Sequence, residues 1–218
     1  MHRTLAAFVC LAVSLSSTAV AAASSPAITF ERSAVVISGV KEKGSVAWLE
    51  AARVFVDMSL RLVRRSDIAV DDDGDGVVRI ELEEDVPEQS VWVAVDLTSG
   101  AFVTAAAQGS ELKPLAIPPS ALRPGALGAS DVFETAGVQL DLLLARPGAG
   151  AWSRALGDGG DADLDGQGDG RLELALEDLR PLGDSPALSP PGIKPGDVLI
   201  VVDPLSLQLY AAQPAVPK

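Results

Sequence analysis

The chain has almost none of the residues used for the commonest catalytic and cross-linking chemistries. Its 218 residues include one cysteine, Cys10, and one histidine, His2. Both lie in a segment that we expect to be removed, so the mature protein would contain no disulfide bond and no imidazole. A Ser-His-Asp triad, a cysteine nucleophile and zinc chemistry are therefore excluded. Neither a Gly-x-Ser-x-Gly motif nor a Walker-type glycine loop occurs in the chain.

The N-terminal segment has the order of a secretory signal peptide. A short basic head, residues 1–3, precedes an apolar run at 5–15, and small residues follow as far as Ala23. This order predicts that 1–23 is a signal peptide and that the mature protein is secreted or periplasmic. A membrane anchor is the alternative, because residues 5–23 are nearly long enough to span a bilayer.

Positive charge is scarce as well. The chain has 17 Lys and Arg against 30 Asp and Glu, a formal net charge of −13. Such a surface repels nucleic acids and anionic lipids, so we expect no nucleic acid and, after signal cleavage, no membrane as a partner. It attracts divalent cations. The partner classes that remain are another envelope protein and a glycan.

The chain carries an internal repeat, which predicts two units at residues 27–108 and 111–216. Both units contain an aspartate-rich segment followed by an alternating apolar run, and both end in similar Val-rich segments with a shared Asp and Ser. Three pairs of segments match in the same order: 48–57 with 132–141, 77–82 with 171–176, and 91–106 with 198–212.

Short Val- and Leu-rich runs separated by Gly, Pro, Asp and Ser predict an all-β protein. We expect two tandem β-sandwich repeats that resemble immunoglobulin-like or fibronectin-like domains, although the Cys…Trp…Cys pattern of antibody domains is absent. One larger, pseudo-duplicated sandwich is the alternative. Residues 46–65 also fit the apolar face of a helix, but the composition of the matching segment favours strands.

Two aspartate-rich loops are the candidate metal sites. Alternating acidic residues followed by a glycine supply the oxygen ligands and the sharp turn that a hard cation needs. The second loop resembles the calcium-binding D-x-D-x-D-G-x-x-D pattern of integrin-type, EF-hand and dockerin loops. The resemblance implies Ca²⁺ with a structural role and the following ligands: Asp161, Asp163, Asp165, Gln167 and Asp169.

The first loop is a shorter version of this pattern. Asp71, Asp73 and Asp75 match the first three ligand positions, and Gly76 follows them. The ninth position is occupied by Arg79, whose charge we expect to oppose a cation. The sequence therefore favours the second loop over the first.

Three functions of different classes remain open. The first is a non-enzymatic binding or structural module of the cell envelope, which requires no catalytic residue. The second is a glycan hydrolase with two carboxylates, for which Trp152 is the aromatic side chain expected to be exposed. Two pairs of acidic residues recur in both units, Glu50 with Glu134 and Asp57 with Asp141. We expect them to be loop or strand-end groups and not the catalytic carboxylates of such a hydrolase. The third is an assembly partner that offers a sheet edge, and a long edge strand without Lys or Pro would support it.

Overall fold

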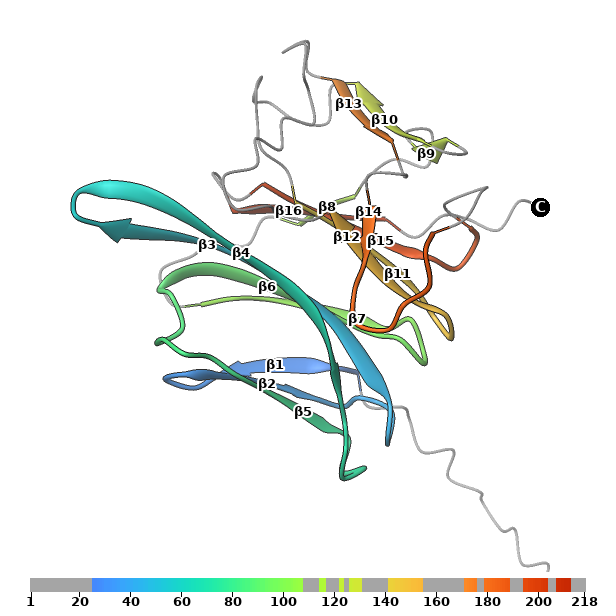
Figure 1. Cartoon of the computed structure of the whole chain (residues 1–218), viewed down its shortest axis with the longest axis horizontal. Coiled ribbons are helices and arrows are strands. Elements are labelled where there is room, and N and C mark those ends of the chain that lie inside the picture. Colours follow the sequence, from blue (N-terminus) through green and yellow to red (C-terminus); the bar gives the residue numbers. More distant parts are fainter. Residues whose placement is uncertain are drawn as a thin grey trace, which may run out of the picture.

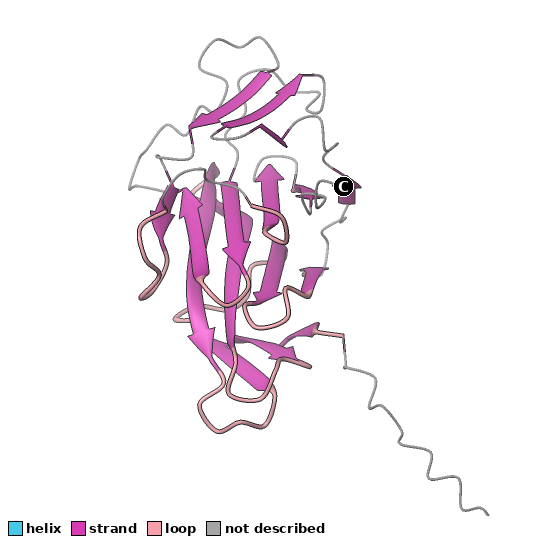
Figure 2. Cartoon of the chain, turned by 90° about the vertical axis from the view of Figure 1, so that its right-hand side faces the viewer, coloured by secondary structure: helices cyan, strands magenta, loops and turns pink. Residues whose placement is uncertain are grey.

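The computed structural model describes residues 25–107, 141–153, 179–188, 194–202, 207 and 209, and the backbone of 114–116, 122–123, 126–130, 154, 171–175, 203, 208 and 210–212. Every regular element in these ranges is a β-strand (Figures 1 and 2). The prediction of an all-β protein of the β-sandwich class is confirmed. The expected signal peptide, 1–23, lies outside the described residues. Within the described ranges, no helix has the length and apolar character needed to cross a membrane.

The N-terminal half forms two antiparallel sheets. Sheet I has the order β1-β2-β5, with β1 at Ala27–Phe30, β2 at Ala34–Ser38 and β5 at Val77–Glu81. Sheet II has the order β4-β3-β6-β7, with β3 at Ser45–Val56, β4 at Ser59–Val70, β6 at Gln89–Asp96 and β7 at Phe102–Ala106. Buried and exposed residues alternate along β5, as the two-residue period of a half-buried strand requires.

The C-terminal half forms two further sheets. Sheet III has the order β14-β12-β11-β15-β16-β8, and its last pair is parallel. Its strands are β8 (Pro114–Ala116), β11 (Asp141–Arg146), β12 (Gly150–Arg154), β14 (Leu179–Pro181), β15 (Val198–Asp203) and β16 (Gln208–Ala212). Sheet IV has the order β13-β10-β9, formed by β9 (Leu122–Arg123), β10 (Ala126–Ser130) and β13 (Arg171–Ala175).

The strand order of the first half recurs in the second. Sheet IV repeats sheet I, with β9, β10 and β13 in the places of β1, β2 and β5. The order β12-β11-β15-β16 within sheet III repeats β4-β3-β6-β7, and β14 and β8 are additions at its two edges. A duplicated topology therefore accompanies the repeated sequence. The unit limits at 108 and 111 lie outside the described residues and stay a prediction.

Strand pairing corrects the register of one segment match. The match of 91–106 with 198–212 makes Val95 the counterpart of Val202. Ala47 lies opposite Val95 in sheet II, and Asp141 lies opposite Val202 in sheet III. Asp141 is therefore the counterpart of Ala47, and the sequence match that paired it with Asp57 was wrong. That match relied on a few identical residues, whereas the register of a strand is set by its hydrogen bonds to the neighbouring strand.

Residues 46–65 form a long hairpin, so the favoured strand interpretation is confirmed and the helical alternative was wrong. β3 and β4 pair along their whole length, from Ser45 with Val70 to Val56 with Ser59. The connection is a two-residue turn in which Asp57 and Met58 have φ angles of 50° and 63°. Positive φ at both positions is typical of the type I′ turn, whose twist matches that of the strands it joins.

The two central strands of sheet II, β3 and β6, are buried on both faces over most of their length. One face packs on sheet I around Trp48 and Trp92, whose rings stack with centroids 5.4 Å apart. The other face packs on sheet III through a second apolar cluster that includes Leu49 and Val93 from sheet II and Leu143 and Ile200 from sheet III. The two halves therefore share one core, and the sheets lie one above another in Figure 1.

Candidate metal centre

The first aspartate-rich loop joins β4 of sheet II to β5 of sheet I. Its two ends are held by the turn between β2 and β3. The N–H of Asp71 donates to the carbonyl of Gly44 (3.0 Å), and the N–H of Val40 donates to the carbonyl of Gly76 (3.1 Å). Gly74 and Gly76 have φ angles of 79° and 78°, which glycine adopts without the steric penalty of a Cβ. The loop is thus a fixed connection between the two layers of the first sandwich.

The carboxylate of Asp71 organises this loop from the inside. The residue is only 1% exposed. Its Oδ1 accepts a hydrogen bond from the N–H of Gly74 (2.9 Å), and its Oδ2 accepts from the N–H groups of Lys43 and Gly76 (3.0 Å each). Burial by itself would raise the pKa of Asp71, but the hydrogen bonds from Gly76, Lys43 and Gly74 outweigh burial and hold the pKa below its ordinary value.

Two of the other three aspartates of the loop, Asp73 and Asp75, bring their carboxylates close to that of Asp71. Asp73 and Asp75 are exposed, and each accepts a hydrogen bond from the N–H two residues further on, Asp75 at 3.2 Å and Val77 at 2.8 Å. One carboxylate oxygen from each of Asp71, Asp73 and Asp75 lies within 4.8 Å of the other two. These three carboxylate oxygens converge, and two of them belong to the exposed residues Asp73 and Asp75. The group can therefore hold a metal ion.

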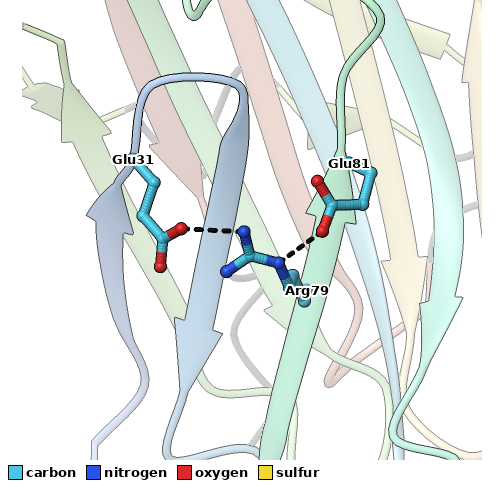
Figure 3. Close-up of polar contacts among 3 residues, drawn as sticks. All are labelled: Glu31, Arg79 and Glu81. Atoms are coloured by element: carbon cyan, nitrogen blue, oxygen red, sulfur yellow. Dashed lines mark hydrogen bonds and ion pairs between the residues drawn. The ribbon is translucent and has the colours of Figure 1, made fainter.

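Arg79, whose charge the sequence set against a cation in this loop, is paired with two glutamates in the structure. It lies on β5, and its guanidinium contacts two carboxylates (Figure 3). Nη2 donates to Oε2 of Glu31 at 2.7 Å, and Nε donates to Glu81. Hydrogen bonding to Arg79 lowers the pKa of Glu31, and the two carboxylates raise the pKa of Arg79. These partners lie at the end of sheet I where β1 turns into β2, away from the loop.

The second aspartate-rich loop lies outside the described residues. This covers every ligand that the calcium-loop resemblance assigned to it: Asp161, Asp163, Asp165, Gln167 and Asp169. The flanking strands are described, however. The loop connects β12 to β13, which occupy the positions of β4 and β5 in the repeated topology. The two loops are therefore equivalent connections in the two halves, as the repeat predicts.

Replacing Asp71 by Asn is expected to lower the melting temperature at pH 7 by several degrees. An amide cannot accept all three hydrogen bonds, because its NH₂ group must face at least one N–H donor. Since the folded-state pKa of Asp71 is depressed, its stabilisation is present above the ordinary value of 3.8 and is lost as pH falls through the folded-state pKa. The difference between variant and wild type should therefore shrink in acid.

Thermal melts from pH 7 down to pH 3 test this expectation. Asp72→Asn is the matched control, because Asp72 is the exposed neighbour in the same loop. A variant difference that is the same at every pH would show that the Asp71 carboxylate is not held ionised by the loop.

A buried glutamate lies in the first half and was not expected there. Glu50 is fully buried in the middle of β3, and Nε of Arg65 on the neighbouring strand is 3.5 Å from its Oε2. Burial raises the pKa of Glu50 to about 7, with Arg65 partly offsetting the rise. It is neither a strand-end nor a loop group, and its counterpart in the second half is the apolar Leu144.

Glu50 and Asp141, the two fully buried carboxylates of the described residues, lie on opposite faces of sheet II. Asp141 is also fully buried, and Nε of Arg64 lies 3.6 Å from its Oδ2. Arg64 and Arg65 are consecutive in β4, so their side chains leave opposite faces of sheet II. Glu50 accordingly faces sheet I, and Asp141 belongs to sheet III on the other side. A glycoside-cleaving dyad needs both carboxylates on one substrate, which this arrangement does not provide.

Trp152 is not the exposed aromatic that the sequence suggested. It lies on β12 and is 1% exposed. Its Nε1–H donates to the carbonyl of Pro186 (2.6 Å), and the guanidinium of Arg146 lies 5.3 Å from the ring centroid. The side chain packs inside the second half and offers no surface for stacking a sugar ring.

No protein-family model, no characterised protein and no solved structure matches this chain at a significant level.

Proposed function

We propose that the protein is a non-catalytic β-sandwich module of the cell envelope, secreted or periplasmic, whose first aspartate-rich loop binds a structural Ca²⁺. The observation that carries this proposal is the convergence of the carboxylates of Asp71, Asp73 and Asp75 within 4.8 Å. The compartment rests on the signal-peptide pattern at 1–23.

Calcium is the ion that this donor set fits best. All three donors are carboxylate oxygens, which hard cations prefer, and the loop has no nitrogen or sulfur ligand for a softer metal. Calcium takes six to eight oxygens in a flexible geometry, and the exposure of Asp73 and Asp75 allows water to complete the set. Magnesium demands near-ideal octahedral geometry and is the natural comparison.

The ion would act as a staple between two layers. The loop joins sheet II to sheet I, so an ion bound only by the folded loop stabilises their mutual arrangement. At a free concentration of 100 times the dissociation constant, such binding adds about 2.7 kcal/mol to the free energy of unfolding. In a mature chain without disulfide bonds, this is a substantial contribution.

The binding role is the alternative that requires no catalytic residue. The buried acids Glu50 and Asp141 lie on opposite faces of a sheet, which disfavours the glycan-hydrolase alternative. The acidic surface favours extracellular solubility, and the partner is another envelope protein or a glycan.

Thermal melts test the proposal. They are measured on the protein without residues 1–23 in millimolar Ca²⁺, in millimolar Mg²⁺ and in chelator. We expect Ca²⁺ to raise the melting temperature by several degrees and isothermal titration calorimetry to show binding. The absence of both a shift in melting temperature and a heat of binding would overturn the proposal.

Two double variants assign the binding to a loop. Asp73→Asn with Asp75→Asn should remove the first site, and Asp163→Ala with Asp165→Ala should remove any second one. The first pair is exposed, so the fold should survive its replacement. Asp72→Asn, beside it, is the control that removes a charge without removing a ligand. Unchanged Ca²⁺ affinity in the first double variant would show that the first loop is not the site.

A further inference from the structure

β4 is a long strand at the edge of sheet II. It has 12 residues, it pairs with β3 on one side, and no described strand pairs with its other side. Its sequence, SLRLVRRSDIAV, contains neither Lys nor Pro, two residues that commonly protect an edge from pairing with another chain. The strand thus has the features, length and freedom from Lys and Pro, that a sheet edge used for pairing with another chain would have.

The turn between β3 and β4 determines which backbone groups face outward. In a hairpin with a two-residue turn, Val56 and Ser59 form the first hydrogen-bonded pair, and hydrogen-bonded and non-hydrogen-bonded pairs then alternate. Every second residue of β4 from Leu60 onward, as far as Ile68, therefore directs its N–H and C=O to the outer edge. The N–H of Ile68 confirms the alternation, because it donates to the Asp67 carboxylate (2.8 Å) and not to β3.

Exposed apolar side chains concentrate on the same hairpin. Of the five large hydrophobic residues that are exposed in the described ranges, Phe55 (69%), Met58 (98%), Leu60 (44%) and Val70 (52%) belong to it, and the fifth is Phe102. Three of the four lie on β4 or in the turn that precedes it. An edge strand lined by apolar side chains and outward-facing amides is a surface suited to pairing with another strand.

We propose that this edge pairs with β4 of a second copy of the chain, antiparallel, to form one continuous sheet across a dimer. Pairing of this kind is isologous, so each contact occurs twice about a two-fold axis. The axis passes beside Arg64, which lies opposite its own counterpart. This inference is independent of metal binding by the aspartate-rich loop.

Charge complementarity favours this register over those shifted by two residues, and a shift of four residues would pair Asp67 with Arg65, which already lies 3.5 Å from Glu50. The favoured register places Arg61 of each copy opposite Asp67 of the other, giving two cross-strand ion pairs. A shift of two residues one way places Arg61 opposite Arg65, which is repulsive. A shift the other way places Arg65 opposite itself and gives no pair of opposite charges. Arg64 tolerates its symmetric position because its side chain is 10% exposed and lies 3.6 Å from Asp141.

Apolar complementarity agrees with the same register. Leu60 lies opposite Ile68, a pair that occurs twice, and the turn that carries the exposed Met58 lies at the end of the other copy's strand, near the exposed Val70. The outward-facing Leu60 and Ile68 form the hydrogen-bonded pairs that an added antiparallel strand requires. The N–H of Ile68 then donates to the other copy, and the Asp67 carboxylate moves from that N–H to Arg61 of the other copy.

Analytical ultracentrifugation at protein concentrations between roughly 1 and 100 µM tests the proposal. Dimers of moderate affinity dissociate measurably in this range. The wild-type protein is expected to dimerise. Arg61→Asp and Asp67→Arg should each weaken the dimer at least tenfold, because each places like charges opposite one another twice. Mixing the two single variants should restore a dimer, since both cross-strand contacts in the mixed pair again join one acidic and one basic side chain.

A backbone variant and a control complete the experiment. Leu62→Pro removes an outward-facing N–H and should abolish the dimer while the β3–β4 ladder is kept, as circular dichroism can verify. Phe102→Ser removes an exposed apolar side chain on β7 and should leave the dimer unchanged. A wild-type protein that is monomeric throughout the range overturns the proposal, and so does a dimer that survives both single charge reversals. Folded single variants that stay monomeric when mixed overturn the register.

Discussion

Replacing Glu50 by Gln is expected to raise the melting temperature at pH 8 by roughly 5–10 °C and to change it little at pH 5. The folded protein holds Glu50 in a fully buried position, where burial raises its pKa from 4.5 to about 7. A shift of this size corresponds to a free energy on the order of 3 kcal/mol, because one pKa unit equals about 1.4 kcal/mol. For a chain of this length, 1 kcal/mol moves the melting temperature by about 2–4 °C.

The sign follows from proton binding. Between pH 4.5 and about 7, the folded state keeps a proton on Glu50 that the unfolded state has already lost. The free energy of unfolding therefore falls as pH rises through this window, and it stays reduced above pH 7. Gln cannot ionise, so the variant loses this part of the pH dependence.

Melts of both proteins between pH 4.5 and 8.5 measure the effect. Glu42→Gln is the control, because Glu42 is exposed and its replacement removes the same charge from the surface. An equal difference between variant and wild type at pH 5 and at pH 8 would contradict the raised pKa of Glu50.

Leu49→Ala and Leu143→Ala are each expected to lower the free energy of unfolding by about 2–5 kcal/mol, as truncation of a buried leucine usually does. Both residues are 1% exposed or less and belong to the same apolar cluster, although one comes from sheet II and the other from sheet III. Because the halves share this cluster, a cavity in either sheet removes contacts from both. Each variant should therefore destabilise the whole protein in a single transition.

Calorimetry together with tryptophan fluorescence distinguishes shared from separate unfolding. Trp48 and Trp92 report on the first half, and Trp152→Phe removes the reporter of the second. Phe55→Ala is the control, since Phe55 is 69% exposed and its loss should change stability by no more than about 0.5 kcal/mol. If Leu143→Ala shifts the Trp152 signal and leaves that of Trp48 and Trp92 in place, the two halves unfold independently.

Local features of the fold were readable from the sequence because they depend on neighbouring residues. The alternation around Val78 and Ile80 predicts a half-buried strand, and the structure has β5 there. Trp48 and Trp92 stand in apolar runs of the sequence, and both are buried in the structure. The aspartate-rich loops were placed between strands at the same point of each repeat, and the strand order of the two halves agrees with this placement.

The errors have a common origin in contacts between distant residues. Arg79 was assigned to the first metal loop by its position in a motif, but its guanidinium is engaged by Glu31 and Glu81. Trp152 was expected on the surface because Gly-rich sequence surrounds it, yet β12 is a strand that buries its ring. The backbone N–H of Lys43 that binds Asp71 was not anticipated. The only signal for it was the turn-forming Lys43-Gly44 pair.

The sequence by itself determined the strand class, the repeat and the clustering of acidic residues, since each is a matter of local spacing and composition. Only the tertiary structure decided that the central strands of sheet II are buried on both faces and that Glu50 and Asp141 lie on opposite sides of this sheet. It also decided that Asp71 is held inside its loop by three N–H groups while Asp73 and Asp75 remain open to solvent. These outcomes depend on strand register and on which sheets pack together. A shift of one residue exchanges the faces of a strand, and local sequence leaves that choice open.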